Sequence, residues 1–170
     1  MSKAFVKEDA QDEPLFVPAR APLPAGTPNY VTSRGLALLQ AERAELQGQR
    51  DQLEATADGD ERRQRLAALA QRIAELEARL ASAVLVESGN QSADVVRFGA
   101  TVTLLADDSE ERRYRIVGVD EADAAQGLVS FLAPIARAML GRQVGDVISL
   151  NTARGTETLE IVAIAYDANE

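Results

Sequence analysis

The sequence predicts an α+β protein in which an N-terminal antiparallel coiled-coil hairpin precedes a small antiparallel-sheet domain. Three observations predict this class: leucines that recur every seven residues, a short glycine-containing break between two such runs, and short β-branched segments in the second half. We expect a proline-rich leader over residues 1–30, the hairpin over residues 31–86 and the sheet domain over residues 87–170.

The leader is rich in proline, which supplies no backbone amide donor and resists the interior of helices and sheets. Two small apolar clusters, residues 4–6 and 15–17, interrupt it. Two interpretations remain open: a flexible leader, or a segment that docks on a partner and becomes ordered on binding. The prolines are Pro14, Pro18, Pro22, Pro24 and Pro28.

Helical periodicity begins after the leader. Thr32 is suited to cap the first helix, with Val31 and Leu36 placed for a hydrophobic staple. Arg43 and Arg50 occupy core-type positions of this helix, so its seam is imperfect, whereas the second helix keeps a regular spacing of three and four residues. The seam residues are Leu39, Leu46 and Leu53, then Leu66, Leu69, Ile73, Leu76, Leu80 and Ala83.

Residues 57–61 form the predicted turn between the helices, with Gly59 at the point of reversal. Helices joined by so short a turn run antiparallel, which gives a helical hairpin. Roughly 25 residues per arm, at about 1.5 Å each, make a rod about 35–40 Å long. Such a rod has little core of its own, so it must pack on a body or project from one.

Five short segments rich in β-branched residues follow, separated by turn formers. Between the third and the fourth, residues 134–140 predict a short helix that Gly141 ends. The expected strands cover residues 100–105, 114–119, 128–131, 147–150 and 158–164.

Composition excludes several classes of function. The chain has no Cys and no His, so disulfides, thiol nucleophiles, Ser-His-Asp triads and conventional zinc sites are ruled out, and a metal would need oxygen ligands. Aromatic residues make up only 4%, which disfavours an aromatic-lined substrate pocket. A net charge of −9 disfavours binding to free DNA. No apolar run is long enough for a membrane span and no signal-peptide core is present, so we expect a cytoplasmic protein.

Four segments resemble the Gre family of bacterial transcription elongation factors. The resemblance is to GreA/GreB-like proteins, and closer to GreB-like proteins with a proline-rich N-terminal leader. It covers residues 29–166 and is most specific in the C-terminal half. The segments are residues 29–36 (NYVTSRGL), 96–100 (VRFGA), 114–121 (YRIVGVDE) and 134–146 (PIARAMLGRQVGD).

The resemblance implies that the C-terminal domain is FKBP-like and docks at the rim of the RNA polymerase secondary channel, while the coiled coil reaches towards the active site. The protein would then be no enzyme itself, but would stimulate the polymerase's intrinsic nuclease at the 3′ end of backtracked RNA. It is expected to act as a monomer. Tip acids would help to hold a second Mg²⁺ ion shared with polymerase, and no ion would be held by the factor alone.

The family's tip motif, Gly-Asp-x-x-Glu-Asn, is only partly present. Asp60 matches the first acid, but Arg63 replaces the second acid and Gln64 replaces the asparagine. The candidates for assisting catalysis are Asp60, Glu61 and Asp58, with Asp60 and Glu61 as the Mg²⁺ ligands. The local alternative is structural: Asp58 as an N-cap with Glu61 at the capping-box position.

Arg62, Arg63 and Arg65 are candidates for contact with RNA phosphates, or else form a solvated face together with Arg72. The expected polymerase-docking residues are Pro134, Ile135, Arg137 and Gly141, and Ala133 stands where relatives commonly carry serine. Three functions remain open: a cleavage-stimulating factor, a channel-occupying regulator that does not stimulate cleavage and competes with cleavage factors, and a chaperone or isomerase-like module that rests on fold analogy alone.

Overall fold

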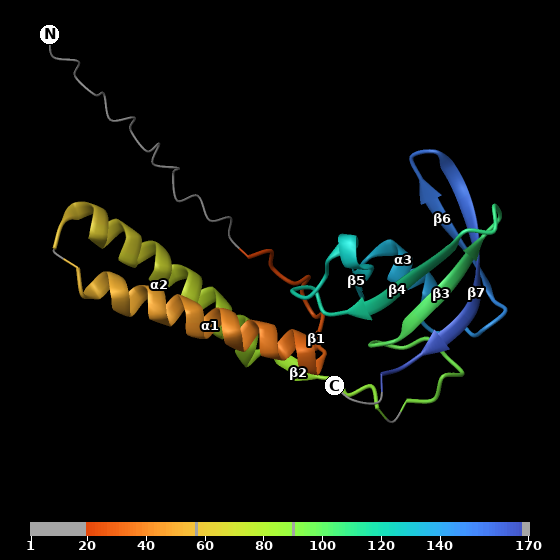
Figure 1. The fold of residues 1–170 in the computed structure, drawn as a ribbon, viewed down its shortest axis with the longest axis horizontal. Helices are drawn as coiled ribbons and strands as arrows, with labels where there is room; N and C mark the ends of the chain where they lie inside the picture. Colours follow the sequence, from red (N-terminus) through yellow and green to blue (C-terminus); the bar gives the residue numbers. More distant parts are fainter. Residues whose placement is uncertain (1–19, 57, 90, 168–170) are drawn as a thin grey trace, which may run out of the picture.

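A computed structural model describes residues 20–56, 58–89 and 91–167 of the chain. It shows a long helical hairpin that projects from a curled sheet domain (Figure 1), and the predicted α+β class is confirmed. Among the described residues, no helix is both long enough and apolar enough to cross a membrane. The apolar clusters at residues 4–6 and 15–17, and Ala57 of the predicted turn, lie outside the described residues.

The hairpin consists of α1 (Ser33–Glu54) and α2 (Asp60–Ala81), each 22 residues long. At about 1.5 Å per residue each arm is about 33 Å long, slightly shorter than expected. The predicted cap of α1 is confirmed, because the Thr32 hydroxyl accepts a hydrogen bond from the Gly35 amide at 2.9 Å.

The seam between the helices is tightest near the sheet domain and loosens towards the tip. Leu46 and Leu76 are 2% and 0% exposed, whereas Leu53 and Leu69 are only half-buried. Ala83 packs against this seam as predicted, but the prediction that it does so from the helix is wrong, since α2 ends at Ala81. The heptad spacing runs on past the residue at which the backbone leaves the helix.

A two-stranded parallel sheet at the base of the hairpin was not expected from the sequence. β1 (Asn29–Val31) precedes α1, β2 (Ala83–Leu85) follows α2, and the two strands pair in register. The Asn29 side chain donates to the Arg79 carbonyl oxygen at 2.9 Å, which ties the chain before α1 to the end of α2. The two ends of the hairpin are therefore fastened together where it meets the sheet domain.

The second domain is a five-stranded sheet of order β5-β4-β3-β7-β6. Its pairings are antiparallel except that β4 and β5 run parallel, so the expectation of a purely antiparallel sheet is corrected at this edge. The predicted helix begins at Pro134 as expected and ends at Met139, before Gly141, which has a positive φ of 81°. The elements are β3 (Thr101–Ala106), β4 (Glu111–Val117), 3-10 helix η1 (Ala124–Gln126), β5 (Leu128–Ser130), α3 (Pro134–Met139), β6 (Val147–Thr152) and β7 (Gly155–Ala165).

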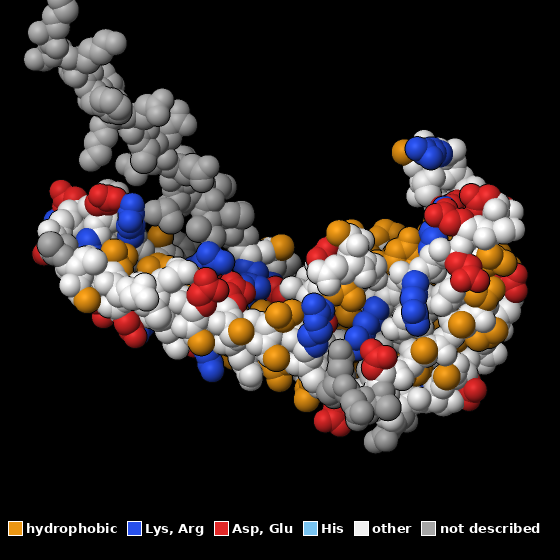
Figure 2. Space-filling view, viewed as in Figure 1, with side chains coloured by type: hydrophobic (Ala, Val, Ile, Leu, Met, Phe, Trp, Pro, Cys, Tyr) orange, Lys and Arg blue, Asp and Glu red, His pale blue; other side chains and the backbone are white. Residues whose placement is uncertain are grey.

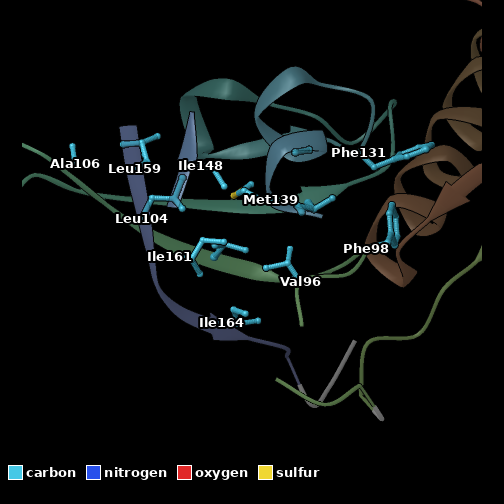
Figure 3. Close-up of a cluster of buried hydrophobic side chains, with 14 residues drawn as sticks. Val96, Phe98, Leu104, Ala106, Phe131, Met139, Ile148, Leu159, Ile161 and Ile164 are labelled. Atoms are coloured by element: carbon cyan, nitrogen blue, oxygen red, sulfur yellow. The ribbon is translucent and has the colours of Figure 1, made fainter. Parts of the chain in front are cut away.

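The main core lies between the sheet and α3, where Met139 packs over the sheet residues Leu104, Ile148 and Ile161 (Figure 3). In β3 the side chains that enter this core alternate with half-buried ones that face the other way. Burial of one face of the sheet fixes its register, and thereby the position of α3 on that face.

An aromatic cluster joins the hairpin to this core. The rings of Tyr30, Phe98 and Phe131 contact one another with centroids 5.6–5.8 Å apart. Tyr30 belongs to β1, while Phe98 and Phe131 belong to the sheet domain. Three of the chain's seven aromatic side chains thus lie at this junction, where they help to hold the hairpin against the domain.

Candidate functional site

The free end of the hairpin carries the three predicted acids. Asp58 lies in the connecting turn, and Asp60 and Glu61 begin α2. The side chains of Asp60 and Glu61 are 88% and 72% exposed. The structure therefore brings the predicted acids to one exposed end of the hairpin, where acidic and basic side chains lie intermixed (Figure 2).

Each tip acid has an arginine partner. Arg62 pairs with Asp58 at 3.3 Å, and Arg65 pairs with Glu61 at 2.6 Å, one helical turn further along. Arg63 contacts Asp60 directly and lies 3.9 Å from Asp58. The negative charge of the tip is thus balanced by arginines of the same helix.

Arg63 occupies the position between two carboxylates. One of its guanidinium nitrogens faces Asp58 and another faces Asp60, so these two acids converge on a single cation. Asp60 and Glu61 are neighbours on a helix, where consecutive side chains diverge by about 100°. The pair that the geometry brings together is Asp58 with Asp60, and the predicted ligand pair of Asp60 with Glu61 stays a prediction.

Arg62 also closes the end of α1. Its guanidinium donates to the carbonyl oxygens of Leu53 at 3.0 Å and Glu54 at 2.9 Å. These carbonyls belong to the last turn of α1, and that of Leu53 also accepts from the Thr56 amide at 3.2 Å and the Thr56 hydroxyl at 2.7 Å. Of the three arginines predicted to contact RNA, Arg62 therefore has a structural task at the turn; contact with RNA stays a prediction for all three.

The prediction that Asp58 caps α2 is wrong. Gly59 is the N-cap residue, in an extended conformation, and no side chain caps this helix. The Asp58 carboxylate instead accepts from the Gly59 amide at 2.9 Å. Glu61 makes no capping-box bond, and its carboxylate pairs with Arg65. The tip acids are consequently not engaged in holding the helix end.

Metal binding by the tip alone finds no support in the geometry. Among the described residues, no three acidic side chains are grouped closely enough to hold an ion. Mg²⁺ requires near-octahedral oxygen coordination, which one or two carboxylates cannot complete. The donor chemistry of Asp58 and Asp60 suits an ion whose other ligands come from a partner.

The predicted docking segment forms α3 and the turn after it. Pro134 and Arg137 are exposed, Ile135 is half-buried against the main core, and Gly141 ends the helix. Arg137 forms no ion pair with any residue that the structure describes. Ala133 is the N-cap and offers no side-chain hydrogen bond, as the sequence implied.

Two exposed valines follow this helix. Val144 and Val147 are 54% and 58% exposed, although both are branched apolar residues. An exposed cation and two exposed apolar side chains within eleven residues are typical of a protein-binding face.

The junction between hairpin and domain contains a polar network that was not expected from the sequence. The Glu121 carboxylate, 1% exposed, accepts from the Thr32 hydroxyl at 2.5 Å and pairs with Arg34 at 3.0 Å. Asp120 pairs with Arg20 and lies 3.4 Å from Arg79. Two consecutive acids of the sheet domain thus hold the start of α1 and the end of α2.

Comparison with known proteins matches this chain to one family. Residues 91–166 match the family model described as "Transcription elongation factor, GreA/GreB, C-term". Proteins called transcription elongation factor GreA are 41% identical over 115 residues in Rickettsia felis, covering 67% of this chain and 71% of the relative, and 40% identical over 119 residues in Rickettsia canadensis, covering 69% and 74%.

Other GreA relatives match this chain over a shorter stretch, which is less than two thirds of their own length. A GreA factor of Beijerinckia indica is 45% identical over 96 residues, which is 56% of this chain and 61% of the relative. These relatives carry the GreA name, so the finer prediction of a GreB-like chain stays a prediction.

Solved structures give weaker likenesses. A GreA/GreB elongation factor of Nitrosomonas europaea is 24% identical, with a TM-score of 0.42 over 81% of this chain and 98% of that one. The GreA factor homologue Gfh1 of Thermus thermophilus is 26% identical, with a TM-score of 0.38 over 82% and 99%.

Proposed function

Because this chain belongs to the GreA/GreB family of transcription elongation factors, we propose that it binds bacterial RNA polymerase and stimulates cleavage of backtracked RNA. The observation that carries the proposal is the exposure of Asp60 and Glu61 at the free end of a hairpin about 33 Å long. The chemistry belongs to polymerase, and this chain acts as a factor in the cytoplasm where polymerase works.

The sheet domain provides the docking face. Pro134, Ile135, Arg137 and Gly141 lie in and just after α3, whose other side is anchored in the main core. A helix fixed in this way presents Arg137 from a rigid support, and its guanidinium, which pairs with no acid among the described residues, is available to a carboxylate of the partner. Docking there leaves the hairpin free to enter the secondary channel.

The tip can release its acids to a metal at little cost. Exposed ion pairs contribute about 0.2–1 kcal/mol each, so exchanging Arg63 for a cation in the polymerase active site is energetically accessible. A Mg²⁺ ion shared with polymerase would supply charge stabilisation for the attacking and leaving oxygens. The tip's own part is to bring Asp60, with Asp58 beside it, into range of that ion on a rigid helix end.

A second function, a channel-occupying regulator that does not stimulate cleavage, is favoured by one observation. Arg63 faces both Asp58 and Asp60, so a fixed positive charge stands where a metal ion would have to approach. The positive charges of Arg63 and of a nearby metal ion would repel each other strongly once water is excluded from the site. A factor of this kind would dock in the same way and compete with cleavage factors for the channel.

Both functions are tested by RNA cleavage in purified backtracked elongation complexes, with binding to polymerase measured in the same samples. The cleavage function predicts that the wild type shortens the RNA and that Asp60→Asn reduces the rate at least about tenfold without loss of binding. The triple variant Asp58→Ala, Asp60→Ala, Glu61→Ala should abolish stimulation.

The charge-reversal variant Arg63→Glu separates the two functions. If the chain is a regulator that does not stimulate cleavage, the wild type should bind polymerase without RNA cleavage. This variant should then gain cleavage because a second acid replaces the cation. Arg65→Glu is the matched control, since Glu61 is the single ion-pair partner of Arg65 within the part of the chain that the structure describes. Absence of binding to polymerase by the wild type would overturn both functions.

A further inference from the structure

An apolar groove lies between the helices where the seam loosens. It has a volume of about 370 Å³ and is bordered by Leu53 of α1, by Thr56 just after that helix, and by Ala68 and Leu69 of α2. Arg65 and Arg72 stand at its edges. The half-buried leucines leave apolar surface exposed there, which the hairpin itself does not cover.

The leader enters the described structure on the same side of the hairpin as this groove. The Arg20 amide donates to Glu75 of α2 at 3.3 Å, and the Arg20 guanidinium pairs with Glu42 of α1 at 2.6 Å. The other oxygen of Glu42 lies 3.4 Å from Arg72, which borders the groove. A single carboxylate, that of Glu42, therefore connects Arg20 of the leader with the edge of the groove.

The chain before Arg20 carries a side chain of suitable chemistry within reach. Phe16, between Leu15 and Val17, precedes Arg20 by four residues, which span up to about 13 Å when extended. Glu75 and Ala68 are seven helical residues apart, or about 10 Å. Phe16 can therefore reach the groove without the leader being fully stretched.

The charges of the leader agree with a chain that runs along the hairpin from Arg20 towards the tip. Asp12 and Glu13 come next along the leader, away from Arg20. With Phe16 in the groove, these acids would lie further towards the tip, where Arg65 stands at the groove edge. Opposite charges at an exposed rim contribute little affinity, but they favour one orientation of a docked segment over its reverse.

We propose that residues 15–17 of this chain dock in the groove between α1 and α2, with the Phe16 side chain against Leu53 and Leu69. The occupant is the protein's own leader because its attachment point holds it beside the groove at a high effective concentration. The leader then forms part of the outer surface of the hairpin. The proposal concerns the free protein and does not depend on the function proposed above.

The test uses the absence of tryptophan from the chain. Phe16→Trp places one fluorescent reporter in the proposed contact, and Phe5→Trp places one in the other apolar cluster of the leader as a matched control. The expected result is an emission maximum at shorter wavelength and weaker quenching by acrylamide for Phe16→Trp than for Phe5→Trp. Adding Ala68→Glu should abolish this difference, whereas Ala67→Glu, exposed but outside the groove, should leave it unchanged.

A second measurement avoids altering the leader's own side chain. Methyl NMR signals of Leu53 and Leu69 should shift when residues 1–19 are removed from the chain, while those of Leu104 in the sheet core should not. Solvent-like emission from Phe16→Trp together with unchanged leucine signals would overturn the proposal. So would a blue shift that survives Ala68→Glu, or one that depends on protein concentration, which would assign the contact to the leader of a second copy.

Discussion

Replacing Gly35 with alanine should destabilise the protein, although alanine is the better helix former. A Gly-to-Ala change inside a helix ordinarily adds about 0.5–1 kcal/mol of stability. At Gly35 the new Cβ atom would lie 2.7 Å from Glu121 Oε2 and 3.3 Å from Thr32 Oγ1. The first distance is too short, so either the carboxylate or the helix must move.

The loss of stability expected for Gly35→Ala follows from the contacts that hold the Glu121 carboxylate. Its carboxylate is almost fully buried and accepts from the Thr32 hydroxyl while pairing with Arg34. Displacing it loses at least one hydrogen bond to a charged group, worth about 1.5–3 kcal/mol. After the gain in helix propensity, we expect Gly35→Ala to lower the free energy of unfolding by about 1–2 kcal/mol.

Gly48 provides a control within the same helix. A Cβ atom added there meets nothing within 4 Å, so Gly48→Ala should raise the free energy of unfolding by about 0.5–1 kcal/mol. The assay is urea denaturation followed by far-UV circular dichroism, with midpoint and slope fitted separately. In a Glu121→Ala background, Gly35→Ala should no longer be destabilising. If Gly35→Ala stabilises the wild-type protein as much as Gly48→Ala does, the reasoning is refuted.

Three further outcomes can be measured. Arg62→Ala should destabilise the hairpin by about 1–2 kcal/mol in thermal melts because it opens the end of α1, whereas Arg65→Ala, which removes only an exposed pair, should change stability by less than about 0.5 kcal/mol. Burial raises the pKa of Tyr166 above its usual value of 10.0. Its contribution to stability is therefore full below pH 10 and is lost as pH rises through the folded-state pKa, so Tyr166→Phe should flatten the decline in unfolding free energy at alkaline pH. Arg137→Ala should weaken binding to polymerase at least about tenfold, with Arg154→Ala, in the turn between β6 and β7, as a control that binds normally.

The hairpin was predictable because its signal is local and repeated. Leucines seven residues apart make a seam in any helix, and the Thr32 cap needs only a neighbour three residues away. The same rule failed at Ala83, where the spacing continues but the backbone turns into β2. Strand pairs of three residues have no sequence signature of their own, since β1 and β2 pair only because the hairpin brings its two ends together.

The acidic tip was located correctly, but its internal pairing was not anticipated. Glu61 and Arg65 are four residues apart on a helix, a spacing from which their ion pair could have been inferred. The cap assigned to Asp58 failed because Gly59 takes the extended conformation that begins α2. The contacts of Glu121 with Thr32 and Arg34 join residues nearly ninety positions apart, and no local pattern encodes such a contact.

The polar network at the junction has a mechanical consequence. Asp120 and Glu121 fasten the base of a lever whose far end is about 33 Å away. A tilt of about 5° at that base sweeps the far end through about 3 Å, more than the length of a bond between a carboxylate oxygen and Mg²⁺. The position of the tip therefore depends on how stiffly the base of the hairpin is held, and the contacts of two neighbouring side chains are part of that hold.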